Sequence, residues 1–319
     1  MDRTTPTSSG LHVVVGAGPI GSAVARRLAA GGATVRVVTR SGRGPLAPNI
    51  ELVAADASHA ERLTHVAHGA SAIYNCANPT YSRWAQDWPP LAASLLAAAA
   101  KTGAVLATAS NIYGYGLVDG PMTEDLPLNA TFTNGRVRNQ MWRDALAASQ
   151  AGKIRMVEVR GADYVGPHAE SQLGERTIPR LLTGKTVRVL GNPDLPHSWT
   201  YTEDMAHALV QLASDEKAYG RAWHAPVTHR TQREALTDFA RLAGVPLPTI
   251  APVPQWMLAG LGMFNPDIRE IRNVLYQVDN PYMVDDTAIR TTFELTPTTW
   301  DDVVRATLAE FTAAQAKAA

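Results

Sequence analysis

Residues 11–21 read LHVVVGAGPIG, a β-branched apolar run that ends in a glycine-rich turn, and residues 22–32 continue as the helical stretch SAVARRLAAGG. The apolar run predicts a buried strand. Gly16 suits a tight turn, Gly18 lets a ligand approach the backbone, and Gly21 lets the helix pack closely on the strand. Strand, turn and helix in this order predict a dinucleotide site with phosphates at the helix N-terminus, the alternative being a turn without a ligand. The candidate residues are Gly16, Gly18, Pro19, Ile20 and Gly21.

The pattern that begins at Leu11 repeats along the first half of the chain. Short β-branched runs alternate with amphipathic or Ala-rich helical stretches, and strands are expected at 11–16, 34–40, 50–56, 71–77, 104–110 and 154–160. Such βαβ repetition predicts an α/β fold with a parallel sheet covered by helices on both faces. The sequence therefore predicts a Rossmann-type doubly wound parallel sheet with a smaller C-terminal α/β substrate lobe.

Gly and Pro become frequent after Arg160, in stretches such as GNPDLPH and VPLPTIAPVP. We expect residues 1–165 to form the nucleotide-binding domain, with 200–230 returning to it through a helix and the strand RAWHAP. Residues 166–199 and 231–319 would form the substrate-binding lobe. Mixed aromatic and charged residues could line a pocket there or could simply pack the lobe: Trp256, Phe264, Arg269, Glu270, Tyr276 and 279–282.

The composition of the chain limits the kinds of molecule that it is expected to bind. Lys plus Arg and Asp plus Glu both total 29, so no bulk charge favours nucleic acid or an anionic membrane. Residues 1–10 have no apolar signal-peptide core and no later stretch is long enough to span a membrane, so we expect a cytoplasmic protein with a small-molecule substrate. The lone cysteine, Cys76, reads as a buried structural thiol. The 9 histidines are scattered and predict no metal site.

The end of the second strand indicates which dinucleotide is bound. An NAD site would carry Asp or Glu there to accept a hydrogen bond from the ribose 2′-hydroxyl. The chain instead continues with Arg40, Ser41 and Arg43, which suit a 2′-phosphate. NADP(H) is therefore the expected cofactor, the alternative being a solvated basic loop.

Two further strand ends carry polar residues on the same expected edge. Asp56 ends the third strand, where its side chain could reach the adenine. Asn75 and Ala77 end the fourth strand, at the carboxyl edge where ligands bind in such sheets. Asp56 and Asn75 could instead be local caps or turn formers.

Four more segments follow the glycine turn in a recognisable order: Asn111–Gly116 (NIYGYG), Asn134–Arg138 (NGRVR), Arg160–Pro167 (RGADYVGP) and Tyr201–Asp204 (YTED). With the glycine motif, the chain from Leu11 to Asp204 resembles the extended short-chain dehydrogenases/reductases, also called the NAD-dependent epimerase/dehydratase family. The resemblance is to its atypical branch, in which the catalytic set is changed.

The resemblance implies a catalytic Ser or Thr, Tyr and Lys at positions that here hold Asn111, Asn134 and Arg138. Asparagine cannot give up a proton near neutral pH. Arg138 can still grip ribose hydroxyls and stabilise a nearby anion. Tyr113 lies where dehydratases of the family carry a catalytic carboxylate, so its phenol is the candidate general acid.

Four loop residues are candidates for substrate contact: Tyr115, Tyr164, His197 and Tyr201. The tyrosines could instead be packing residues, and the histidine a surface or supporting group. We expect an NADP(H)-dependent oxidoreductase or epimerase acting on a small carbonyl or alcohol. A non-redox isomerase, lyase or cyclase that retains NADP, and a protein that senses NADP(H), are the alternatives. A homodimer through helices at 91–100 and after Gly135 is a further hypothesis.

Overall fold

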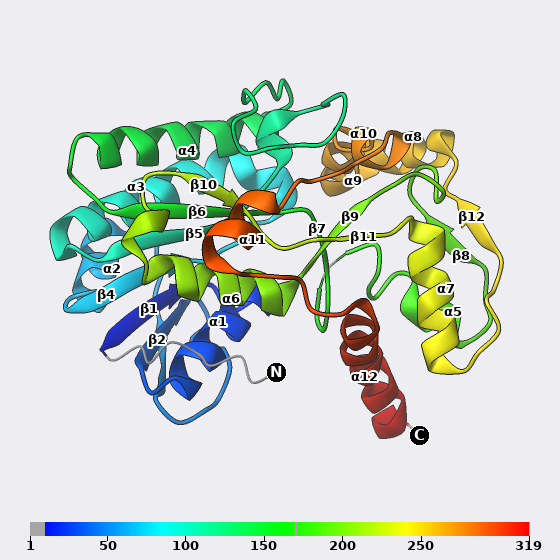
Figure 1. Ribbon diagram of the computed structural model, residues 1–319, viewed down its shortest axis with the longest axis horizontal. Helices are drawn as coiled ribbons and strands as arrows, with labels where there is room; N and C mark the ends of the chain where they lie inside the picture. The colour runs from blue at the N-terminus through cyan, green and yellow to red at the C-terminus, as the bar shows by residue number, and fades with distance from the viewer. Residues whose placement is uncertain (1–9, 170, 319) are drawn as a thin grey trace. The chain divides into compact units, whose positions relative to one another are not determined.

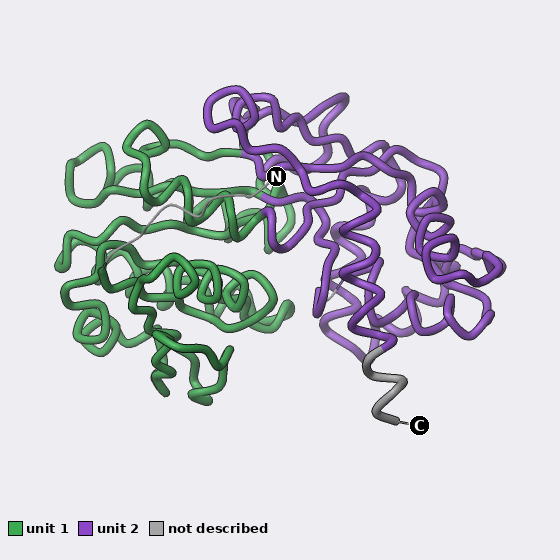
Figure 2. The backbone as a smooth tube through the Cα atoms, turned by 60° about the horizontal axis from the view of Figure 1, so that its bottom comes forward, with its two compact units in different colours: residues 1–114, 128–160, 205–223 green, residues 115–127, 161–204, 224–319 purple. Residues whose placement is uncertain are grey.

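The computed structural model describes residues 10–169 and 171–318, and its backbone divides into two compact units (Figure 2). Unit 1 takes the described chain up to Gly114, then Leu128–Arg160 and Met205–Trp223. Unit 2 takes Tyr115–Pro127, Gly161–Asp204 and the described chain from His224 onward. The domain border expected at residue 165 stays a prediction.

A seven-stranded sheet forms the centre of unit 1, with strand order β10-β6-β5-β4-β1-β2-β3 (Figure 1). The pairs β1–β2, β1–β4, β2–β3 and β4–β5 are parallel. The predicted Rossmann-type sheet is confirmed, and residues from RAWHAP form β10 at its edge. The strands are β1 (Leu11–Val15), β2 (Thr34–Thr39), β3 (Ile50–Ala54), β4 (Ala70–Asn75), β5 (Val105–Asn111), β6 (Met156–Gly161) and β10 (Ala222–His224).

Helices cover this sheet because their apolar faces need burial. Helix α3 contacts α2 and α4, whereas α1 packs against β1 and β2. The buried cluster beneath α2–α4 includes Ile73 and Leu106 from strands and Leu95 from a helix. The helices are α1 (Pro19–Ala30), α2 (Ala60–Val66), α3 (Trp84–Thr102), α4 (Thr133–Gln150) and α6 (Thr202–Ala213), with short 3-10 turns η1 (Tyr81–Arg83), η2 (Tyr113–Tyr115) and η3 (Glu216–Ala218).

Unit 2 is built around two small sheets, one of order β11-β9-β7 and one of order β12-β8. Its core packs Trp199, Phe239 and Val304 from segments far apart in the sequence. Thr231 and Glu234 form a capping box that starts α7, and Gly244 ends it in the left-handed conformation with φ 69°. The strands are β7 (Asp163–Val165), β8 (Val187–Val189), β9 (Ser198–Tyr201), β11 (Thr228–His229) and β12 (Ile250–Pro252). The helices are α5 (Ile178–Leu182), α7 (Gln232–Ala243), α8 (Gln255–Phe264), α9 (Pro266–Arg272), α10 (Tyr276–Asp279), α11 (Thr287–Phe293) and α12 (Trp300–Ala318).

Two expectations from the composition of the chain can be compared with the structure. Among the described residues, none of the helices combines the length and apolar character that crossing a membrane requires. Cys76 is buried, as predicted, and burial raises the pKa of its thiol to about 12. The homodimer stays a prediction.

Candidate functional site

The glycine turn between β1 and α1 is shaped by close backbone contacts. Gly16 has φ +97°, and a Cβ on it would lie 2.6 Å from the carbonyl oxygen of Cys76. A Cβ on Gly21 would lie 2.1 Å from the carbonyl oxygen of Gly16. Side chains at these two positions would collide with backbone that cannot easily shift. The fold itself therefore requires glycine at 16 and 21.

Gly18 is different, because the fold does not require it. It is the N-cap residue of α1 with φ −67°, an angle that any residue adopts. A Cβ on Gly18 would meet no atom of the described residues within 4 Å. Pro19 follows at the first helical position, where its missing N–H costs nothing. The open space above Gly18, at the N-terminus of a helix, fits the phosphates of a dinucleotide.

Asn75, at the end of β4, supplies an independent sign of a ligand. The backbone N–H of the next residue, Cys76, donates to the carbonyl of Val15 at 2.9 Å, which fixes the ends of β4 and β1 side by side. Asn75 is 1% exposed, and its Oδ1 has no hydrogen-bond partner among the residues that the structure describes. A buried oxygen left unpaired costs about 1–3 kcal/mol. A donor group on a bound cofactor would remove that cost, so the residues present fit a dinucleotide.

The loop after β2 carries the charge expected of an NADP site. Arg40, Ser41 and Arg43 are exposed. The hydroxyl of Thr39 donates to the carbonyl of Arg43 at 2.9 Å, and the N–H of Arg43 donates to the Ser41 hydroxyl at 3.3 Å. These bonds give the loop a defined shape, with no carboxylate in the loop to compete for Arg40.

Asp56 is already used within its own turn. The backbone N–H and the hydroxyl of Ser58 donate to its Oδ1 at 2.9 and 2.8 Å, and these bonds hold the pKa of the Asp56 carboxyl below its usual value. The positive charge of Arg40 adds a smaller lowering effect. Asp56 thus forms a turn through one oxygen, and its contact with adenine stays a prediction.

Two catalytic candidates lie at the carboxyl end of β5. The Oδ1 of Asn111 accepts from the N–H of Tyr113 at 3.2 Å, so Asn111 shapes the turn that carries the tyrosine. The ring of Tyr113 lies 6.1 Å from that of Trp84 between centroids. We call the group to which it belongs the aromatic cluster, made of Tyr81, Trp84, Trp88, Tyr113 and Phe132.

The other two candidates, Asn134 and Arg138, stand one turn apart on α4 and are both buried. The amide of Asn134 donates to the carbonyl of Tyr81 at 3.3 Å. The guanidinium of Arg138 lies over the rings of Trp84 and Trp88, at 4.6 and 4.4 Å from their centroids. The structure therefore brings Tyr113, Asn134 and Arg138 together at one cluster of unit 1.

Sequence reasoning missed the two tryptophans that hold Arg138. Trp84 and Trp88 are four residues apart at the start of α3, so they share a helix face, and both are buried. A guanidinium over aromatic rings is stabilised by their negative faces, by about 2 kcal/mol or more when water is excluded. The spacing of the two tryptophans was the available signal, but their partner lies on α4, far away in the sequence.

Two of the substrate candidates in unit 2 are buried. Tyr115 is 1% exposed, and its hydroxyl lies 2.8 Å from Nε2 of His224. His197 is 2% exposed; its Nε2 lies 3.0 Å from a carboxylate oxygen of Asp163, and its ring stacks on Tyr282 with centroids 5.0 Å apart. In this structure both side chains pack and bond within unit 2, and their contact with substrate stays a prediction.

The other two, Tyr164 and Tyr201, are half-buried beside glycines. A Cβ on Gly161 would lie 2.5 Å from the hydroxyl oxygen of Tyr164. A Cβ on Gly166, whose φ is +136°, would lie 2.9 Å from Cε2 of Tyr201. Each tyrosine therefore packs against the backbone, and its contact with substrate stays a prediction.

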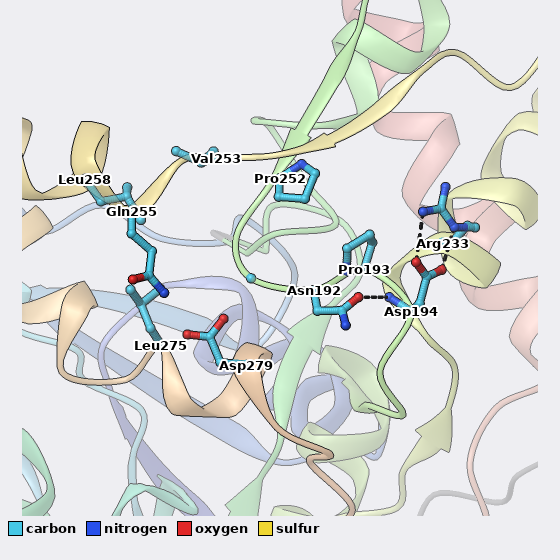
Figure 3. Close-up of a pocket in the computed structure, with 11 residues that line it drawn as sticks. Asn192, Pro193, Asp194, Arg233, Pro252, Val253, Gln255, Leu258, Leu275 and Asp279 are labelled. Carbon is cyan, nitrogen blue, oxygen red and sulfur yellow. Dashed lines mark hydrogen bonds and ion pairs between the residues drawn. The ribbon is translucent and has the colours of Figure 1, made fainter.

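Unit 2 also holds a pocket of about 370 Å³ that the sequence did not identify as a whole (Figure 3). Only the Gly-Pro-rich stretch GNPD and Asp279 had drawn attention. The amide oxygen of Asn192 accepts from the N–H of Asp194 at 3.0 Å, and Asp194 pairs with Arg233 through bonds of 2.5 and 3.0 Å. The lining residues are Gly191, Asn192, Pro193, Asp194, Arg233, Pro252, Val253, Gln255, Leu258, Leu275 and Asp279.

Comparison with protein families agrees with the geometry of the glycine turn. A model of the NAD dependent epimerase/dehydratase family matches residues 12–224. That range contains the glycine turn, the aromatic cluster and every strand of the central sheet except the first residue of β1. No curated protein matches the chain.

Solved structures with the same fold include sugar-nucleotide enzymes. The UDP-glucose 4-epimerase of Thermotoga maritima, solved with UDP-glucose, is 18% identical with a TM-score of 0.77, covering 96% of this chain and 99% of that one. The UDP-glucuronic acid 4-epimerase of Bacillus cereus, solved with UDP-glucuronic acid and NAD, is 17% identical with a TM-score of 0.76, covering 95% and 99%. The dTDP-glucose 4,6-dehydratase of Bacillus anthracis, solved with NAD, is 18% identical with a TM-score of 0.75, covering 95% and 96%. At these identities the likeness shows the fold.

Proposed function

The chain belongs to the NAD-dependent epimerase/dehydratase family, and from that premise we propose that it is an NADP(H)-dependent oxidoreductase or epimerase acting on a small carbonyl or alcohol. The observation that carries the proposal is the open space at Gly18. Nothing in the fold requires glycine there, so a ligand at the helix N-terminus is the best reason for it. The unpaired Oδ1 of Asn75 supports the same ligand.

The preference for NADP over NAD rests on the loop after β2. An exposed Arg40 with the Ser41 hydroxyl beside it suits the 2′-phosphate, and no carboxylate stands in the loop to bind a 2′-hydroxyl. NAD is the cofactor named for two of the similar structures. We therefore infer that this chain departs from those proteins at this one contact.

The proposed chemistry uses Tyr113 as the general acid. A bound nicotinamide nucleotide supplies a hydride donor or acceptor. Tyr113 gives a proton to the substrate oxygen or takes one from it, and Asn111 fixes the turn on which it stands. Arg138, held by Trp84 and Trp88, stabilises the negative charge that forms when a proton leaves and holds ribose hydroxyls.

A non-redox isomerase, lyase or cyclase is the second candidate, and Asn134 is the observation that favours it. At the position of the family's tyrosine the chain carries an amide, which donates to the carbonyl of Tyr81 and does not titrate. In that reaction the nucleotide stays bound without exchanging hydride, and Tyr113 alone moves protons.

The cofactor assignment is tested by calorimetric titration with NADPH and NADH. We expect NADPH to bind more tightly than NADH, and Arg40→Ala to weaken NADPH binding by about 1.5–3 kcal/mol, as loss of a charge-assisted phosphate contact does. Binding of NADH should not change. Arg62→Ala, which removes an exposed arginine from α2, is the matched control. Equal binding of both nucleotides, or an effect of Arg62→Ala as large as that of Arg40→Ala, would sink the assignment.

The two candidate reactions are separated with NADPH that carries deuterium at the reactive carbon of the nicotinamide. Turnover of a carbonyl substrate should place the label in the product, and Tyr113→Phe should lower the rate by about 10²–10⁴-fold while NADPH binding persists. A product labelled only from deuterated solvent would instead support the non-redox candidate. The sugar nucleotides named for the similar structures are the first substrates to try, because the family includes enzymes that act on them.

A further inference from the structure

The pocket of unit 2 has a charge pattern that the cofactor assignment does not use. Its lining contains one cation, Arg233, and two carboxylates, Asp194 and Asp279. Both carboxylate oxygens of Asp194 bond the Arg233 guanidinium, at 2.5 and 3.0 Å. The guanidinium also holds the pKa of Asp194 below its ordinary value, so this carboxyl stays ionised at neutral pH. The pocket's one cation is therefore already neutralised.

The second carboxylate, Asp279, is exposed, and no ion pair joins it to a described residue. Figure 3 shows Asp279 and Gln255 on one side of the pocket and the Asp194–Arg233 pair on the other, with Asn192 and Pro193 between them. Asp279 is an acceptor without a partner, and Gln255 can both donate and accept. This side of the pocket attracts a cation or a hydrogen-bond donor and repels an anion.

The remaining lining is apolar and the pocket is small. Pro252, Val253 and Leu258 lie along it with Leu275. A volume of about 370 Å³ is at the lower end for sites that hold a drug-sized molecule, so a ligand the size of one sugar ring fits better than a sugar nucleotide. A diphosphate carries negative charge that must be matched by free cations or N–H donors, and this lining has a net excess of carboxylate.

We propose that the pocket of unit 2 recognises a small polar molecule bearing a protonated amine, held by Asp279, and that the Asp194–Arg233 pair excludes the diphosphate of a sugar nucleotide. The inference goes beyond the proposed function, because it assigns a ligand to a pocket whose lining lies entirely in unit 2.

The first test compares three probes by ligand-observed NMR titration: glucosamine, glucose and UDP-glucose. The full-length protein is kept in excess NADPH, so that the proposed phosphate site at Gly18 does not take up the diphosphate of UDP-glucose. Glucosamine and glucose share a ring and differ in an amine at neutral pH, so the pair isolates the charge. We expect glucosamine to bind about tenfold more tightly than glucose. UDP-glucose should be the weakest of the three. Tighter binding of UDP-glucose than of glucosamine, or binding of none of the probes, overturns the proposal.

Two variants locate the effect in the pocket. Asp279→Asn keeps the size of the side chain and removes its charge, so it should abolish the roughly tenfold preference for glucosamine over glucose. Asp194→Asn releases the Arg233 guanidinium and should raise the affinity for UDP-glucose about tenfold. Asp302→Asn, an exposed carboxylate on α12 that pairs with Arg305, is the control and should change neither. An unchanged preference in Asp279→Asn contradicts the proposal.

A parallel titration of each variant with NADPH keeps the two proposals apart. The substituted residues all lie in unit 2, whereas the glycine turn lies in unit 1. Unaltered NADPH binding together with the wrong order of probes would overturn the ligand assigned to the pocket and leave the cofactor assignment standing. If the wild-type protein does not bind NADPH, the cofactor assignment fails and the ligand assigned to the pocket is judged by the probes alone.

Discussion

The glycine turn of unit 1 and the pocket of unit 2 begin with a similar glycine and continue with different chemistry. Gly16 comes directly after the end of β1, and Gly191 comes two residues after the end of β8. Both have a positive φ, +97° for Gly16 and +65° for Gly191. A Cβ would meet a neighbouring carbonyl oxygen in each case, at 2.6 Å from Cys76 and 2.4 Å from Val278. The first turn leads into a helix N-terminus and the second into the Asp194–Arg233 pair. In both turns the glycine allows a close backbone contact, and the residues that follow it decide which ligand can bind.

The largest expected effect separates two glycines of the same turn. Gly21→Ala should lower the free energy of unfolding by about 2–4 kcal/mol, because its Cβ would lie 2.1 Å from a backbone oxygen. Gly18→Ala should change stability by less than about 0.5 kcal/mol yet weaken NADPH binding by tenfold or more, since its Cβ enters only the phosphate space. Urea unfolding and calorimetry measure the two effects. Equal destabilisation by both substitutions would remove the case for a ligand at Gly18.

The second effect tests the pocket in the same way. Gly191→Ala should cost about 1–3 kcal/mol of stability, since it combines positive φ with a collision at the carbonyl oxygen of Val278. Binding of glucosamine should fall with it, whereas NADPH binding should stay the same. Gly184, which also has positive φ but whose Cβ would meet no described atom within 4 Å, gives the control Gly184→Ala. If Gly184→Ala lowers stability as much as Gly191→Ala does, backbone strain alone explains the glycine at 191.

A smaller effect asks whether Tyr115 supports the fold or the reaction. Tyr115→Phe removes the hydrogen bond to Nε2 of His224 and should lower stability by about 1–2 kcal/mol. Turnover under conditions where the protein is folded should not change, in contrast to Tyr113→Phe. Thermal unfolding and steady-state rates on the same sample decide the matter. A loss of turnover without a loss of stability would return Tyr115 to the substrate site.

The smallest effect is a pH dependence that arises from β1, just before the glycine turn. His12 is 3% exposed, and burial lowers the pKa of its imidazole below the ordinary histidine value of 6.5. As pH falls below 6.5, His12 takes up a proton in the unfolded chain before it does so in the folded protein. The free energy of unfolding therefore decreases by at most about 1.4 kcal/mol per pH unit until the lower pKa of the folded protein is reached. His12→Gln should flatten that slope. His59→Gln, at an exposed position, should leave it in place. A slope that survives His12→Gln would assign it to other groups.

Much of unit 1 was predictable because its pattern is local. Each strand of the central sheet is a short apolar run bounded by turn residues, and the strand at 222–224 lies at the edge of that sheet. α4 begins at Thr133, two residues before the expected start, where Phe132 is its N-cap. The glycine spacing gave Gly16 and Gly21 their roles, since a turn and a close helix contact depend on neighbouring residues alone.

The candidate site was predictable only in part. Position in a motif placed Asn134 and Arg138 one helical turn apart, but it could not show that Trp84 and Trp88 hold the guanidinium. Loop position favoured Tyr115 and His197 as substrate contacts, whereas both are nearly fully buried. Gly and Pro marked the stretch at 191–193, yet the pocket also needs residues from α8 and α10.

The sequence by itself determined the strand–turn–helix unit, the residues of the glycine turn and the lack of a carboxylate after β2, because these depend on residues close together in the chain. Only the tertiary structure decided which polar side chains are available to a ligand. The hydroxyl of Tyr115 is taken by a histidine 109 residues away, and Arg233 is neutralised by a carboxylate 39 residues away. Burial and pairing of this kind are set by contacts between distant segments, which no local pattern encodes.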